Sequence, residues 1–117
     1  MNYLKKRILA FSYAFKGMAY LFTHEAHAII HLIAAIGVIV AGVLFKISMI
    51  EWCLISLCIG GVFMAEAFNT AIEKLADKIS PEQDPLIGIA KDVSAAAVLL
   101  LAISTVVIAA FIFIPRF

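Results

Sequence analysis

The sequence predicts an all-α integral membrane protein with three transmembrane helices and an N-terminal amphipathic helix that lies in the membrane interface. Of its 117 residues, 65% are hydrophobic and only 15% are charged. A soluble domain contains about 45–50% apolar and about 25% charged residues, so this composition is typical of a bilayer protein. One crossing needs about 20 helical residues, so the chain has room for about four or five spans at most. We therefore expect a single membrane domain over residues 1–117, whose chemistry is done by the membrane helices and their connections.

The N-terminal segment, residues 1–27, has the pattern of an interfacial helix. Its apolar residues recur at spacings of three and four and form one stripe, whereas Lys5, Ser12 and Lys16 lie off it. Such a helix places aromatic side chains in the lipid and its cations near anionic headgroups. The stripe consists of Leu4, Ile8, Phe11, Phe15, Met18 and Phe22.

Three apolar segments follow, separated by polar interruptions. The first carries no formal charge, and the second is apolar at its start and polar toward its end. Charges and prolines then indicate a connection, and Pro115 and Arg116 close the last segment. The predicted spans are residues 28–46, 50–75 and 93–114, with residues 76–92 as the connection.

The distribution of basic residues predicts the orientation. Three crossings put the chain ends on opposite sides, and the positive-inside rule places the more basic side in the cytoplasm. That side has Lys5, Lys6, Arg7, Lys16, Lys74, Lys78 and Lys91, against Lys46 and Arg116 on the other. The N-terminus and the connection at 76–92 are therefore expected to be cytoplasmic, and the polar end of the second span faces the compartment that holds ATP.

Glu66 is the first candidate for chemistry, because it lies well inside the second predicted span. A carboxylate at membrane depth costs about 2.5–3.5 kcal/mol on insertion scales and indicates a functional site. At about 100° per residue, Asn69, Thr70, Glu73 and Asp77 share its helix face within an arc of about 100°. The alternative interpretation is a set of helix–helix hydrogen bonds, in which Asp77 gives structural support or is simply a solvated end residue.

Several carboxylates on one face favour a bound divalent cation, which removes their mutual repulsion. Oxygen ligands suit Mg²⁺, which usually shares its shell with substrate phosphates. Glu25 ends the interfacial segment and is expected to approach Glu73 at the cytoplasmic boundary, whereas the deeper Glu66 suits a general base for a lipid hydroxyl. The sequence contains no GxxxxGK[ST] phosphate loop, so a nucleotide would be held in another way.

Other reactive side chains receive a structural interpretation. His24, His27 and His31 share one side of a helix and are interpreted as interfacial residues, with a zinc site as the alternative. Cys53 and Cys58 lie five residues apart in an apolar run and are expected to be inert buried thiols. Glu51 and Trp52 are expected to anchor the second span at the outer interface. The net charge of +1 argues against a nucleic-acid partner.

The stretch EAFNTAIEKLADKISPEQDPLIGIAKDVSAAAVLL, from Glu66 to Leu100, resembles the signature of the small prokaryotic diacylglycerol kinase family, which includes undecaprenol kinases. The core E-x-x-N-x-A-I-E-x-x-x-D and the later A-K-D carry the resemblance. The earlier FSYAFKGMAYLFTHEAHAIIHLIAA is similar to the first half of the same family.

The resemblance implies a homotrimer in a bacterial cytoplasmic membrane, with active sites at the cytoplasmic boundary shared between subunits. It implies that Glu66 is the catalytic base and that Glu25 and Glu73 hold the Mg²⁺ that bridges the ATP phosphates. The implied nucleotide contacts are Lys6, Tyr13, Glu25, Glu73, Glu82, Lys91 and Asp92, and the implied lipid-substrate contacts are Glu66, Asn69, Lys16 and Ala95. Lys6 stands where some members have Arg, so the adjacent Arg7 is an alternative phosphate contact. Ser94-Ala95 replaces a Gly-Ser of some members, which loses or shifts a serine contact to the lipid.

The function that follows is transfer of the ATP γ-phosphoryl group to the primary hydroxyl of a lipid alcohol. The NTAIE motif from Asn69, IHLIAA from Ile30 and the Glu51-Trp52 pair resemble the undecaprenol kinase branch, and the predicted lipid-facing surfaces offer few hydrogen-bond donors for ester carbonyls. Undecaprenol is therefore the expected substrate, with diacylglycerol as the alternative. The non-enzymatic alternative is a proton-coupled transport subunit in which Glu66 and Glu73 relay protons.

Overall fold

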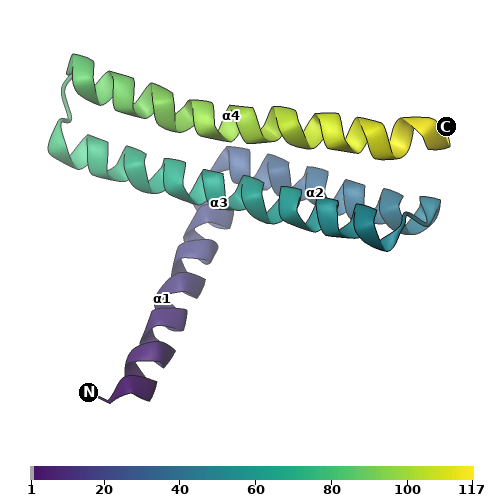
Figure 1. Ribbon diagram of the computed structural model, residues 1–117. Coiled ribbons are helices and arrows are strands. Elements are labelled where there is room, and N and C mark those ends of the chain that lie inside the picture. Colours follow the sequence, from purple (N-terminus) through teal and green to yellow (C-terminus); the bar gives the residue numbers. More distant parts are fainter. Residues whose placement is uncertain (1) are drawn as a thin grey trace.

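The computed structural model describes residues 2–117, which form four α-helices, a short C-terminal 3₁₀ turn and no strand (Figure 1). Three of the helices are long and apolar enough to cross a membrane. The predicted all-helical, multi-pass membrane architecture is therefore confirmed. The elements are α1 (Tyr3–His24), α2 (Ala26–Phe45), α3 (Met49–Ile79), α4 (Pro85–Phe113) and η1 (Ile114–Arg116).

The helices α2, α3 and α4 form an antiparallel bundle from which α1 diverges (Figure 1). α3 contacts both α2 and α4, and the C-terminal part of α1 reaches the same helix. A buried cluster of Ile47, Ile55 and Ile112 joins the three helices at the end opposite the α3–α4 connection. α3 is therefore the element against which every other helix is positioned.

The turn between α2 and α3 is short because both helix ends are capped. Lys46 adopts a left-handed conformation, with φ of 54°, and its backbone N–H bonds to the carbonyl groups of Gly42 and Val43. Ser48 then begins α3 with a capping box, in which its side chain and that of Glu51 each accept a backbone N–H. These caps reverse the chain within residues 46–48 and place α3 directly beside α2.

The predicted connection at residues 76–92 is mostly helical. α3 continues to Ile79 and α4 begins at Pro85, so the connection between the two helices is limited to residues 80–84. The Asp84 side chain accepts the backbone N–H of Leu86 at 2.9 Å, and Pro85 occupies the first turn, where its missing N–H costs nothing. The result is two helices that extend beyond the length of the predicted spans.

The end of the bundle opposite the α3–α4 connection is joined by an ion pair that the sequence did not predict. Arg116 donates two hydrogen bonds to Glu51, Nη1 to Oε2 at 2.9 Å and Nη2 to Oε1 at 2.7 Å. Trp52, the other predicted interface anchor, packs against Gly42 of α2. Glu51 and Trp52 therefore hold the helix ends at this side of the bundle to one another.

Candidate active site

Glu66 is buried near the middle of the polar half of α3, where only 3% of its surface is exposed. Its Oε1 atom lies 2.8 Å from Nδ1 of His31 on α2. Both atoms are shielded from solvent, and neither makes a hydrogen bond of good geometry with any group, so the two face one another only as a close contact. Because a carboxylate oxygen and a bare imidazole nitrogen are both acceptors, a hydrogen bond between them requires one proton on either atom.

One helical turn closer to the α3–α4 connection, Asn69 is held by α4. The hydroxyl of Ser94 donates a hydrogen bond to Asn69 Oδ1 at 2.8 Å. Ser94 is buried, so this contact lies inside the α3–α4 interface. With its carbonyl engaged, the Asn69 side chain has its NH₂ group available as a donor beside Glu66.

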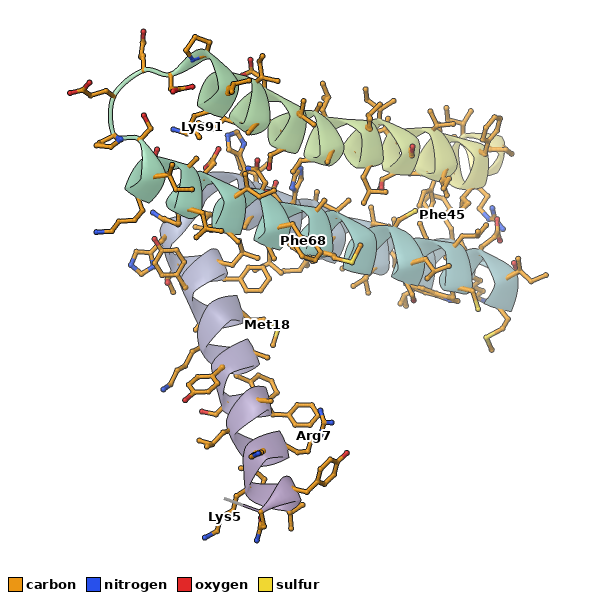
Figure 2. The ribbon with its side chains drawn as sticks, turned by 60° about the vertical axis from the view of Figure 1, so that its left-hand side comes forward. Lys5, Arg7, Met18, Phe45, Phe68 and Lys91 are labelled. Carbon is orange, nitrogen blue, oxygen red and sulfur yellow. The ribbon has the colours of Figure 1, made fainter. Side chains whose placement is uncertain are left out.

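At the end of the bundle, the Lys91 ammonium pairs with the Asp77 carboxylate across α3 and α4. Figure 2 shows Lys91 at the loop end of the bundle, far from Phe45 at the other end. Lys91 also lines a hollow of about 540 Å³ that the connection forms, together with Glu82. The structure thus gathers two of the predicted nucleotide contacts around one hollow and gives Asp77 a partner on α4.

Glu25 and Glu73 are half-buried, and neither takes part in the three ion pairs within residues 2–117. Glu25 separates α1 from α2 and makes no capping hydrogen bond with its side chain, so its carboxylate remains available. No group of three or more His, Cys, Asp or Glu residues that could hold a metal forms within the described chain. Mg²⁺ does not require three protein ligands, because it is usually bound through one or two carboxylates while substrate phosphates and water complete its shell.

The predicted contacts on α1 lie along an exposed helix. Lys6, Tyr13 and Lys16 are all exposed, and the Lys16 ammonium lies 5.6 Å from the centre of the Tyr13 ring. Figure 2 shows Lys5 and Arg7 toward the free end of α1, away from the bundle. Asp92 and Ala95 are exposed on α4. Within one chain, α1 approaches α3 near Lys74, whose ammonium lies 5.4 Å from the Tyr20 ring centre.

The three histidines occupy different surroundings. The His24 ring stacks on Tyr20 with 4.3 Å between the ring centres, His27 is exposed, and His31 contacts Glu66. They form no common site in this structure. Cys58 is buried as expected, whereas Cys53 is exposed on the apolar bundle surface.

The sequence singles out Glu66 and Asn69 as candidates but does not predict their partners. It gives Ser94 as a position where a serine contact to the lipid is lost or shifted, and His31 as an interfacial residue with a zinc site as the alternative. Polar side chains that lie at membrane depth on other helices could have indicated these partners, because such groups usually pair within the bundle. The sequence then predicts that a partner exists but does not tell which polar residue it is.

Comparison with known proteins decides the family. A model of prokaryotic diacylglycerol kinases matches residues 12–113. This chain belongs to the prokaryotic diacylglycerol kinase family. It is 37% identical over 115 residues to an undecaprenol kinase of Bacillus subtilis (strain 168), covering 98% of this chain and 94% of that protein. It is also 32% identical over 109 residues to a diacylglycerol kinase of Synechocystis sp., covering 92% of this chain and 62% of that protein.

Family membership confirms the predicted enzyme class, an ATP-dependent lipid kinase embedded in a membrane. The part of the chain that the family model matches also includes the buried polar residues of α3. The Glu66–Asn69 segment lies inside the matched region, as do its partners on α2 and α4.

Proposed function

We propose that this lipid kinase phosphorylates undecaprenol, transferring the γ-phosphoryl group of ATP to its primary hydroxyl at the cytoplasmic surface of a bacterial membrane. The observation that carries the proposal is the buried carboxylate of Glu66, one helical turn from the hydrogen bond between Ser94 and Asn69 at the polar end of α3. The alternative acceptor is the primary hydroxyl of diacylglycerol, because one relative is named for that activity.

The length of α3 supports a position of Glu66 at the boundary between the hydrocarbon and water, where this reaction would take place. Its 31 residues extend about 46 Å, whereas the hydrocarbon core is about 30 Å thick. If the core begins at Met49, about 20 residues cross it, and the inner boundary falls near Phe68. Glu66 then lies at the edge of the hydrocarbon, where the hydroxyl of a lipid alcohol meets water, and Glu73 lies outside.

Glu66 is proposed as the general base. Its carboxylate takes the proton of the lipid hydroxyl while that oxygen attacks the γ-phosphorus and the bond to the β-phosphate oxygen breaks. The products are the lipid phosphate and ADP, and Glu66 then releases the proton to water. The Asn69 amide, oriented by Ser94, is proposed to hold the attacking oxygen or a phosphoryl oxygen.

Mg²⁺ is proposed to be held by Glu25 and Glu73, whose carboxylates have no ion-pair partner among residues 2–117. When bound, the ion neutralises charge on the ATP phosphates. Glu82, Lys91 and Asp92 lie on or beside the connection and are proposed to contact the nucleotide.

The predicted contacts on α1 suggest that a complete active site needs residues from more than one chain. Lys6, Tyr13 and Lys16 lie on the divergent helix α1, so we propose that they complete the site of a neighbouring subunit in a homotrimer. Arg7 is the alternative to Lys6 as a phosphate contact. Ala95 is proposed to face the lipid substrate, because it is exposed next to Ser94. The cytoplasmic N-terminus follows from the excess of basic residues on that side.

Two observations favour undecaprenol over diacylglycerol. The relative that is 37% identical over nearly the whole chain is named an undecaprenol kinase. In addition, a cavity of about 160 Å³ between α2, α3 and α4 is lined by His31 and otherwise mostly by small and apolar side chains. Such surroundings suit a hydrocarbon chain better than ester carbonyls, which require hydrogen-bond donors.

The test of the base is Glu66→Gln, with Glu51→Gln as the control on the same helix. The glutamine retains the shape of the side chain but not its basicity, so kcat for lipid phosphorylation should fall about 10²- to 10⁴-fold while ATP binding is retained. The Glu51→Gln variant should keep its kcat, because Glu51 lies at the outer end of α3. Near-normal turnover by Glu66→Gln would refute the assignment.

The acceptor is tested with purified protein, ATP and matched mixed micelles that contain either undecaprenol or diacylglycerol. The expected result is a higher kcat/KM for undecaprenol. A tenfold preference for diacylglycerol would establish the alternative, and phosphorylation of neither lipid would refute both proposed acceptors.

A further inference from the structure

We infer that His31 is a positioning residue for Glu66: when the two side chains align, a protonated Nδ1 donates a hydrogen bond to Oε1 and holds the carboxylate so that Oε2 faces the substrate hydroxyl. The inference rests on the proposed role of Glu66 as the base. The 2.8 Å contact between the two side chains is its structural basis.

Only one placement of the proton in this contact allows Glu66 to act as a base. A general base must be an ionised carboxylate, so the proton between the two atoms has to reside on His31 Nδ1. A neutral imidazole with Nδ1 protonated satisfies this condition and leaves Nε2 without a proton. The pairing therefore selects one tautomer of His31, as orienting hydrogen bonds do at other histidine sites.

Because both atoms are shielded from solvent, losing this contact should change the position of the Glu66 carboxylate. Oε1 of Glu66 and Nδ1 of His31 are buried and have no hydrogen-bond partner elsewhere, so each is the group in reach that can satisfy the other, and loss of the imidazole would leave the carboxylate oxygen without a candidate donor. The free carboxylate would then rotate toward any other donor or admit water. Because catalysis depends on the placement of the base within a fraction of an ångström, this rotation should slow the chemical step.

Three substitutions at position 31 separate hydrogen bonding from packing. Asparagine carries its NH₂ group at the position of imidazole Nδ1, glutamine carries it one bond farther out, near the position of Nε2, and leucine carries no donor. His27→Leu, on the same helix at an exposed position, is the matched control.

The expected result in steady-state kinetics is a fall in kcat of about 10- to 100-fold for His31→Leu, with the KM values for ATP and lipid little changed. His31→Asn should recover most of the lost kcat, His31→Gln should not, and His27→Leu should behave like the unmodified protein. Equal activity of the Asn, Gln and Leu variants would overturn the inference, whether all three are active or all are inactive.

A second measurement does not depend on activity. In protein labelled with ¹⁵N-histidine, the nitrogen chemical shifts of His31 should report a protonated Nδ1 and a bare Nε2, and this preference should weaken in Glu66→Leu. A bare Nδ1 would overturn the inference, because Glu66 would then carry the proton. Normal turnover by Glu66→Gln would instead defeat the proposed base, whereas an inactive Glu66→Gln with a normal His31→Leu would defeat this inference alone.

Discussion

Removal of the Ser94 hydroxyl tests whether the α3–α4 interface is held together at the site. In the structure this hydroxyl donates to Asn69 Oδ1 at 2.8 Å, and Ser94 is 6% exposed. Ser94→Ala keeps the β-carbon and the helix but removes the hydroxyl that donates to Asn69 Oδ1. The variant should therefore lose stability without losing its fold.

The magnitude follows from the location of the bond between two membrane helices. Interhelical hydrogen bonds in membrane proteins contribute about 0.6 kcal/mol on average and about 1.7 kcal/mol at most. Because Ser94 is buried and Asn69 is only half-buried, the released amide oxygen can partly reach water, so the full cost of an unsatisfied buried acceptor does not apply. We expect the free energy of unfolding to fall by about 0.6–1.7 kcal/mol.

The assay is unfolding in mixed micelles with increasing dodecyl sulfate, followed by circular dichroism, within a double-mutant cycle with Asn69→Ala. Ser104→Ala is the control on the same helix, because the Ser104 hydroxyl donates only to the carbonyl group of Leu100 in its own helix, at 3.0 Å. The control should change stability by less than about 0.5 kcal/mol. The reasoning fails if Ser94→Ala unfolds like Ser104→Ala or if its effect adds fully to that of Asn69→Ala.

Three further substitutions, with one control, test the α2–α3 turn and the proposed metal site. In Gly42→Ala the new Cβ would lie 2.6 Å from Trp52 Cη2, so the free energy of unfolding in the same micelles should fall by about 1–3 kcal/mol. Gly37→Ala meets nothing within 4 Å and should be neutral or slightly stabilising, and equal effects at the two glycines would contradict the packing argument. Glu25→Gln and Glu73→Gln should each raise the Mg²⁺ concentration needed for half-maximal activity, with partial recovery at higher Mg²⁺. An unchanged Mg²⁺ dependence would exclude that carboxylate as a ligand.

The sequence determines the helices and the polar face of α3, because both depend on local spacing. An uncharged run between Ala28 and Phe45 predicts a span, and the 3.6-residue period alone places Glu66, Asn69 and Glu73 on one face. The resemblance to lipid kinases rests on the same contiguous motif. None of this requires knowledge of how the helices pack.

Helix ends were less predictable, because membrane exit and helix termination are different events. The charges from Glu73 to Lys78 indicate a segment outside the hydrocarbon, yet they do not stop the helix. The Ser80 backbone N–H still bonds to the carbonyl of Ala76, and α4 begins as soon as Asp84 and Pro85 supply a cap and a first turn. The α3–α4 connection is therefore confined to residues 80–84.

Only the tertiary structure decided which polar groups meet. His31 reaches Glu66 from α2, and Ser94 reaches Asn69 from α4 across 25 residues of sequence. In a soluble helix the apolar stripe marks the buried face, but lipid is as apolar as a packed interface, so hydropathy does not tell which side of α2 or α4 turns toward α3. The rotation of each helix about its axis is set by side-chain packing and by the few hydrogen bonds available in the bilayer, and that rotation brings His31 to Glu66.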